Sequence, residues 1–158
     1  MTSRIIRNIA AAAVIIILCG YKIPVFSHCQ IPCGIYDDKH YFKQLFLDIK
    51  TIRKSTETII NLSQQEHKNP NQLVRWVINK ENHANSVMKI IAEYFLAQRL
   101  KKPANKSKQT EQHYLEQLKL LHQMLVAAMK CKQRARLEDS AKLRTLTEAF
   151  YDCYFQKH

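Results

Sequence analysis

The chain is organised around residues 28–36, which read His-Cys-Gln-Ile-Pro-Cys-Gly-Ile-Tyr. This stretch, called the hook below, places one imidazole and two thiols within the six positions from His28 to Cys33. The whole chain of 158 residues has only two glycines, and one of them is Gly34. Gly34 permits positive φ, and Pro32 fixes its own φ, so the backbone can turn sharply here. The pattern predicts a compact metal-binding segment.

Residues 1–27 are typical of a secretory leader. Arg4 and Arg7 precede a continuous run of 11 apolar or small residues at positions 9–19, and this order of basic and apolar segments marks export signals. The run is too short for a transmembrane span, which takes about 20 residues. We therefore expect no stable membrane insertion once the leader has been removed.

Cleavage after Ser27 would make His28 the N-terminus of a mature domain covering residues 28–158. A free amine, an imidazole and two thiols would then meet in one segment. Thiolates and nitrogen donors favour nickel or copper, whereas carboxylates would suit magnesium or calcium. An N-terminal amine titrates near ~8 and a free thiol near ~8.5, so a metal that binds at neutral pH must displace their protons.

The residues alone leave two alternatives open for the hook. Cys29 and Cys33 could form a short disulfide, because oxidising compartments favour such bonds. The same two thiols and His28 are also a known zinc ligand set. Zinc does no redox chemistry, however, and a hook this short suits a planar site better than a tetrahedral one.

The hook resembles the mature N-terminus of nickel superoxide dismutases, which begins His-Cys-x-x-Pro-Cys-Gly-x-Tyr. The sequence is identical at all six fixed positions, which are His28, Cys29, Pro32, Cys33, Gly34 and Tyr36. The resemblance implies one nickel ion per subunit, with His28, Cys29 and Cys33 as ligands and Tyr36 lining the approach to the metal. It also implies that superoxide is disproportionated to dioxygen and hydrogen peroxide in a Ni(II)/Ni(III) cycle, and that subunits form a homohexamer.

A second stretch extends the resemblance. Residues 80–85 (Lys-Glu-Asn-His-Ala-Asn) and 94–98 (Tyr-Phe-Leu-Ala-Gln) are similar to the family's second helix. The resemblance makes His83 a candidate to support the metal ligands from behind the hook. An acidic residue that helps to hold the axial histidine would fall near Gln44, and here that position carries no charge.

The rest of the chain predicts an all-α fold. Gly and Pro are scarce, and apolar residues recur at helical spacing. We expect four helices. The first starts at Asp37 or Asp38 and ends near residue 64, and the other three span about residues 70–102, 111–134 and 137–155. The second helix is expected to be interrupted near residues 79–85, where asparagines cluster. Four amphipathic helices with short polar connections predict a four-helix bundle.

The charge of the chain is strongly basic. The formal net charge is +12, and three of its basic residues (Arg4, Arg7 and Lys22) lie in the leader, which leaves +9 for the mature chain. Lys and Arg are spread along all predicted helices without a nucleic-acid motif, so we expect no nucleic-acid partner. A basic surface could also attract anionic superoxide.

Two cysteines lie on the predicted helices, Cys131 and Cys153. They could pair with each other after export or remain as buried free thiols. His113 and His122 lie on one predicted helix but nine residues apart, so they do not share a clean face. We interpret both histidines as structural.

Two functions of different classes follow. The first is a nickel-dependent superoxide dismutase that is exported to the periplasm or the extracellular space. The family also includes chains trimmed by a dedicated peptidase inside the cell, so a cytoplasmic location is the alternative. The second function is an exported, basic, helical binding protein with a Cys29–Cys33 disulfide and no enzymatic activity. The position of the mature N-terminus discriminates between them.

Overall fold

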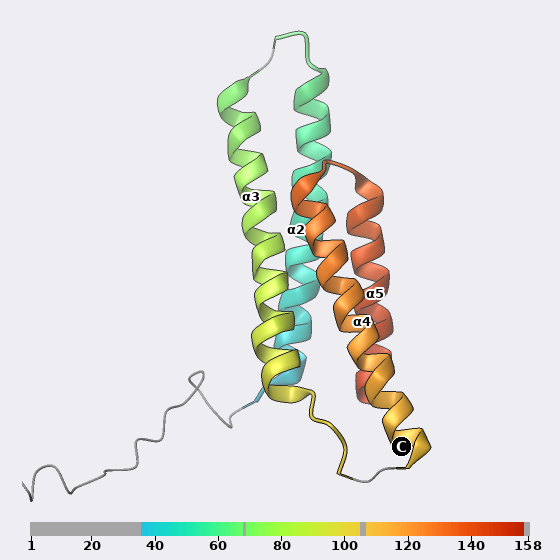
Figure 1. Cartoon of the computed structure of the whole chain (residues 1–158). Coiled ribbons are helices and arrows are strands. Elements are labelled where there is room, and N and C mark those ends of the chain that lie inside the picture. Colours follow the sequence, from blue (N-terminus) through green and yellow to red (C-terminus); the bar gives the residue numbers. More distant parts are fainter. Residues whose placement is uncertain (1–35, 68, 105–106, 157–158) are drawn as a thin grey trace, which may run out of the picture. The chain divides into compact units, whose positions relative to one another are not determined.

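The computed structural model describes residues 36–67, 69–104 and 107–156, which form a bundle of antiparallel helices (Figure 1). The elements are α2 (Asp38–Gln64), α3 (Pro70–Lys89), the π-helix η1 (Ile90–Arg99), α4 (Lys108–Gln133) and α5 (Leu137–Phe155). Helix α2 packs against α3 and α5, and α4 packs against α3 and α5. The prediction of an all-α four-helix bundle is confirmed. No helix among the described residues combines the length and apolar character that crossing a membrane requires.

Side-chain caps explain where three of the helices begin. Asp37 is the N-cap of α2, and its Oδ1 accepts a hydrogen bond from the backbone N–H of His40 at 2.9 Å. Asn69 caps α3 in the same way, with Pro70 in the first turn, where its missing N–H costs no helical hydrogen bond. Ser107 caps α4, so this helix begins at Lys108, three residues before the predicted start.

The predicted interruption of the second helix near residues 79–85 is wrong. Helix α3 runs unbroken through this stretch because its polar side chains find partners on other helices. Asn79 donates from Nδ2 to Ser55 Oγ at 2.9 Å, and Lys80 donates to three backbone carbonyls at the end of α4. These contacts outweigh the weak helix propensity of asparagine. The irregularity lies further on, in η1, and the helical segment ends at Arg99 rather than near residue 102.

The hydrophobic core runs along the bundle and is aromatic near the start of α2. Phe42, Phe95 and Phe150 are almost completely buried. Their ring centroids lie 4.9–5.5 Å apart, the range in which aromatic pairs attract beyond their apolar burial. The three rings come from α2, η1 and α5, so these elements are packed together directly behind the first turn of α2.

The two helical cysteines are free, so the possible Cys131–Cys153 disulfide is wrong. Cys153 Sγ lies 3.8 Å from His113 Nδ1, near the start of α4, whereas Cys131 lies in the last turn of the same helix. Positions 113 and 131 are about 27 Å apart along a helix axis, far beyond the reach of a disulfide. His113 also contacts the side chain of Gln117 at 2.7 Å.

Candidate functional site

The residues predicted to bind nickel lie outside the described part of the chain. His28, Cys29 and Cys33 precede residue 36, so their geometry is not described. Tyr36 is the one described residue of the hook, and it is 37% exposed. It directly precedes the N-cap Asp37, so the hook ends where α2 is about to begin. The predicted ligand set therefore stays a prediction.

The donor chemistry of the hook fits nickel. Two thiols, an imidazole and, if the chain is cut after Ser27, a free amine would provide sulfur and nitrogen donors of the kind that nickel takes. Among residues 36–67, 69–104 and 107–156, no group of three or more His, Cys, Asp or Glu side chains lies close enough together to hold a metal ion.

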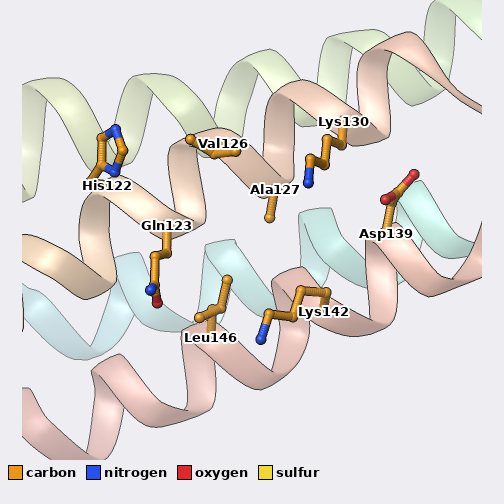
Figure 2. A pocket seen from close by; sticks show the side chains of 8 residues that line it. All are labelled: His122, Gln123, Val126, Ala127, Lys130, Asp139, Lys142 and Leu146. Carbon is orange, nitrogen blue, oxygen red and sulfur yellow. The ribbon is translucent and has the colours of Figure 1, made fainter.

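A pocket of about 320 Å³ lies between α4 and α5. Lys130 and Lys142 lie on either side of it, and His122 and Asp139 also contribute to its lining (Figure 2). His122 is thus placed at a surface depression with mixed charges. None of the residues that the sequence predicts for the metal site lines this pocket.

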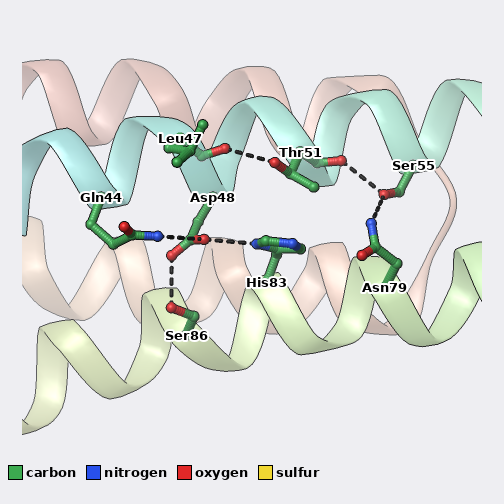
Figure 3. A network of polar contacts seen from close by, with 8 residues as sticks. All are labelled: Gln44, Leu47, Asp48, Thr51, Ser55, Asn79, His83 and Ser86. Carbon is green, nitrogen blue, oxygen red and sulfur yellow. Dashed lines mark hydrogen bonds and ion pairs between the residues drawn. The ribbon is translucent and has the colours of Figure 1, made fainter.

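The structure brings Gln44 and His83 together on one buried carboxylate, that of Asp48 (Figure 3). Asp48 is 1% exposed. Its Oδ1 accepts a hydrogen bond from Gln44 Nε2 at 3.1 Å and lies 2.7 Å from His83 Nδ1. Its Oδ2 accepts from Ser86 Oγ at 2.7 Å. A buried carboxylate needs such partners because leaving its charge unpaired would be very costly.

The carboxylate of Asp48 lies next to Gln44, so this part of α2 carries an acidic group although Gln44 itself is neutral. Gln44 and Asp48 are one helical turn apart on α2, so both face α3. Gln44 donates its amide N–H to Asp48. Asp48 in turn holds the His83 ring by its Nδ1, as carboxylates commonly hold functional histidines. The two residues that the family resemblance singled out are therefore parts of one network.

Asp48 was not predicted from the sequence, although the sequence contains a signal for it. An acidic residue stands within the apolar run of α2, between Leu47 and Ile49. A charged residue on the buried face of a helix is rare unless it is paired. Its partners His83 and Ser86 lie 35 and 38 residues away, so only the packing of α2 against α3 reveals the pairing.

A second carboxylate, partly buried, lies at the first residue of α2. Asp38 accepts four hydrogen bonds: Oδ1 from Tyr94 Oη and Arg99 Nε, both at 2.7 Å, and Oδ2 from Arg99 Nη2 at 2.8 Å and Tyr154 Oη at 3.0 Å. Burial acts to raise the pKa of Asp38, but the hydrogen bonds from Arg99, Tyr94 and Tyr154 lower it below its usual value. Burial and the charge of Asp38 raise the pKa of Tyr154 to about 12. Asp38 is thus an ionised acceptor for neutral tyrosine hydroxyls.

The fold and the segment before it define a class: a helical-bundle protein whose helices follow a segment rich in sulfur and nitrogen donors. Residues 24–158 match the family described as nickel-containing superoxide dismutase. The chain belongs to this family, whose members are nickel-dependent oxidoreductases that act on superoxide.

A solved structure agrees with the fold. The crystal structure of a tyrosine-to-phenylalanine mutant of NiSOD is similar to this chain with a TM-score of 0.59 and 18% sequence identity. The match covers 81% of this chain and 96% of the other. At this identity the likeness concerns the fold alone. No curated protein matches the chain.

Proposed function

We propose that the mature chain disproportionates superoxide at a nickel ion held by the hook, in a Ni(II)/Ni(III) cycle. The observation that carries the proposal is the identity of the hook to the family pattern at all six fixed positions within residues 28–36. The family match supports it, because it begins at residue 24 and so includes the hook but leaves out most of the basic and apolar leader.

His28, Cys29 and Cys33 are the proposed ligands. Cys29 and Cys33 bind as thiolates and His28 through its amine and imidazole, so nickel binding releases their protons. Pro32 fixes its own φ and Gly34 permits positive φ, which would allow the chain to bring both thiols to one metal ion. When bound, nickel supplies the one-electron redox chemistry by which two superoxide ions and two protons yield dioxygen and hydrogen peroxide.

Tyr36 is proposed to line the approach to the metal. It follows the second thiol by three residues, and its partial exposure is consistent with a place on an access route. A formal net charge of +9 on the mature chain would draw anionic superoxide toward the protein, an effect that weakens as salt screens the charges.

Maturation is a further part of the proposal. We propose that a peptidase removes residues 1–27 and frees the amine of His28, that the leader directs export, and that the mature subunits assemble into a homohexamer. Removal by a dedicated peptidase in the cytoplasm is the alternative route. An uncleaved chain would lack the free amine, so processing would control when the enzyme becomes active.

Intact mass and metal content of the mature protein, measured on one sample, test the proposal. A chain that starts at His28 and holds about one nickel per subunit would support it. A chain that starts at another residue, or one with Cys29 and Cys33 joined and no nickel, would overturn it. The second result would favour the exported binding protein.

A further inference from the structure

The π-helix η1 brings two donors onto one carboxylate. Tyr94 and Arg99 are five residues apart and both donate to Asp38. In an α-helix, residues five apart point roughly 140° away from each other. A π-helix has i→i+5 hydrogen bonds and a wider turn, so residues five apart point much more nearly to the same side. The N–H of Leu100 bonds to the carbonyl of Phe95 at 2.8 Å in this pattern.

The side chain of Gln98 adds a hydrogen bond within η1. Gln98, which is 8% exposed, donates its side-chain amide to the backbone carbonyl of Glu93 at 2.9 Å. π-helical turns are less stable than α-helical ones and occur frequently at functional sites. Here the visible result of the π-helix is that Tyr94 and Arg99 meet Asp38.

The carboxylate of Asp38 joins three elements at the same end of the bundle. The first turn of α2, η1 and the last turn of α5 lie together there (Figure 1), and Tyr154 supplies the donor from α5. The Asp38 side chain is 18% exposed and that of Arg99 27%. A bidentate arginine–carboxylate pair in which the carboxylate also accepts from two hydroxyl groups holds its side chains far more rigidly than a surface ion pair does.

Asp38 is also two residues from the hook. Tyr36, the last hook residue, directly precedes the N-cap, so chain geometry alone limits the Cα–Cα separation of Tyr36 and Asp38 to about 7 Å. Holding Asp38 therefore holds the point at which the hook leaves the helix. A segment fixed at one end loses less conformational entropy when it closes around a ligand than a free segment does.

We propose that Asp38, held by Arg99, Tyr94 and Tyr154, is a positioning residue that prepares the hook for nickel, and that η1 exists to assemble this cluster. The inference rests on the proposed function, since it concerns the same metal site. It predicts that loosening the cluster lowers nickel affinity by more than the accompanying loss of bundle stability explains.

A matched pair of variants separates the two effects. Arg99→Leu removes the ion pair to Asp38. Arg134→Leu removes a comparable pair, Arg134 Nη2 to Asp139 Oδ1 at 2.9 Å, with 39% and 12% of the side chains exposed. The control pair joins the end of α4 to the start of α5 and is far from residue 36 along the chain. If Arg99→Leu does not fold, Tyr94→Phe, which removes one hydroxyl donor to Asp38, takes its place in the comparison.

Two quantities are measured on the mature full-length chain: the free energy of unfolding in urea without metal, and the nickel dissociation constant by competition with a chelator. We expect both Leu variants to lose similar stability. The dissociation constant should rise about tenfold or more in Arg99→Leu, as it does when residues that support metal ligands are removed. It should stay within about twofold of the parent in Arg134→Leu, and Tyr94→Phe should show a smaller rise than Arg99→Leu.

If Arg99→Leu or Tyr94→Phe bound nickel as tightly as the parent does, the inference would be overturned and the proposed function would stay intact. An equal loss of affinity in Arg99→Leu and Arg134→Leu would also overturn it, since the effect would then come from bundle stability. A parent chain starting at His28 that binds no nickel would instead overturn the proposed function.

Discussion

The side-chain nitrogen of Lys80 lies 2.6 Å from the backbone carbonyl oxygen of Cys131, within the core of the bundle. The same Nζ donates to the carbonyls of Lys132 and Arg134 at 2.8 and 3.0 Å. Lys80 belongs to α3 and is 3% exposed, and its three acceptors are the carbonyls with which α4 ends. A helix C-terminus carries partial negative charge and unpaired carbonyls, so a buried cation from the neighbouring helix caps α4 from the side.

Replacing Lys80 with Met should therefore destabilise the bundle although the new side chain is apolar and of similar length. Three buried carbonyls would lose their donor, and we expect a loss of about 2–4 kcal/mol in the free energy of unfolding. Urea denaturation measures this value. Lys119→Met is the control, since Lys119 forms only an exposed i,i+3 pair with Glu116 and should change stability by less than about 0.5 kcal/mol. Equal effects of the two substitutions would contradict the capping role.

Asp48→Asn should destabilise the contact between α2 and α3. An asparagine has one acceptor oxygen, so it cannot accept from Gln44, His83 and Ser86 as the carboxylate does. We expect a loss of about 1–3 kcal/mol, because at least one buried donor stays unpaired. Ser86→Ala removes a single donor and should cost less. A thermal or urea unfolding series of the two variants and the parent ranks them, and a larger loss in Ser86→Ala would refute the central place of Asp48.

The stability of the bundle should fall in acid partly through Asp38. The pKa of this carboxyl is lower in the fold than its ordinary value of 3.8. The unfolded chain therefore binds more protons, so the contribution of Asp38 is fully present above pH 3.8 and is lost as pH falls through the folded pKa. The difference in unfolding free energy between the parent and Asp38→Asn should be constant from pH 5 to 7 and shrink below about pH 4. A difference that stays constant into acid would contradict the lowered pKa.

The hook ligands can be tested by substitution in the mature chain. Cys29→Ser or Cys33→Ser should abolish both nickel binding and superoxide turnover, because a neutral hydroxyl is a poor substitute for a thiolate. His28→Ala keeps the N-terminal amine and both thiols, so it should spare nickel binding more than turnover. Metal content and initial rates of superoxide loss are the measurements. Activity retained in either Ser variant would refute the ligand assignment.

The sequence was sufficient for the features that local chemistry determines. Scarce glycine, apolar spacing and an aspartate at position 37 or 38 predicted the helical class and the start of α2. Helix α5 spans Leu137–Phe155 as expected. These features depend on residues close together in the chain, and their physical causes can be recognised without tertiary contacts.

Features that depend on distant partners were not predictable in this way. In α4 the apolar residues Leu115 and Met129 are 55% and 39% exposed, while Gln117 is buried, so apolar character at helical spacing does not by itself identify the buried face. The π-helix escapes any pattern with a period of 3.6 residues, and its contacts with Asp38 join residues more than 50 positions apart in the chain. Asp38, Asp48 and Lys80 became recognisable only when helices from distant parts of the chain were packed together.

The four cysteines of the mature chain should differ in their reaction with an alkylating reagent. Cys131 is 2% exposed, and burial, with the charge of Asp139, raises its pKa to about 11. Cys153 is half-buried, and burial, with the charge of Glu116, raises its pKa as well. Because the thiolate is the reactive form, Cys131 should be the slowest to react at pH 8 in the folded protein and Cys153 somewhat faster.

Nickel should change the reactivity of the hook cysteines alone. Without metal and with a reductant, Cys29 and Cys33 should be alkylated before Cys131, and bound nickel should protect both because ligating thiolates are engaged. Peptide mass spectrometry follows each site over time. In urea all four thiols should react at similar rates, which serves as the control. Modification of Cys131 as fast as Cys153 in the folded protein would contradict its burial, and hook thiols that react equally with and without nickel would contradict their role as ligands.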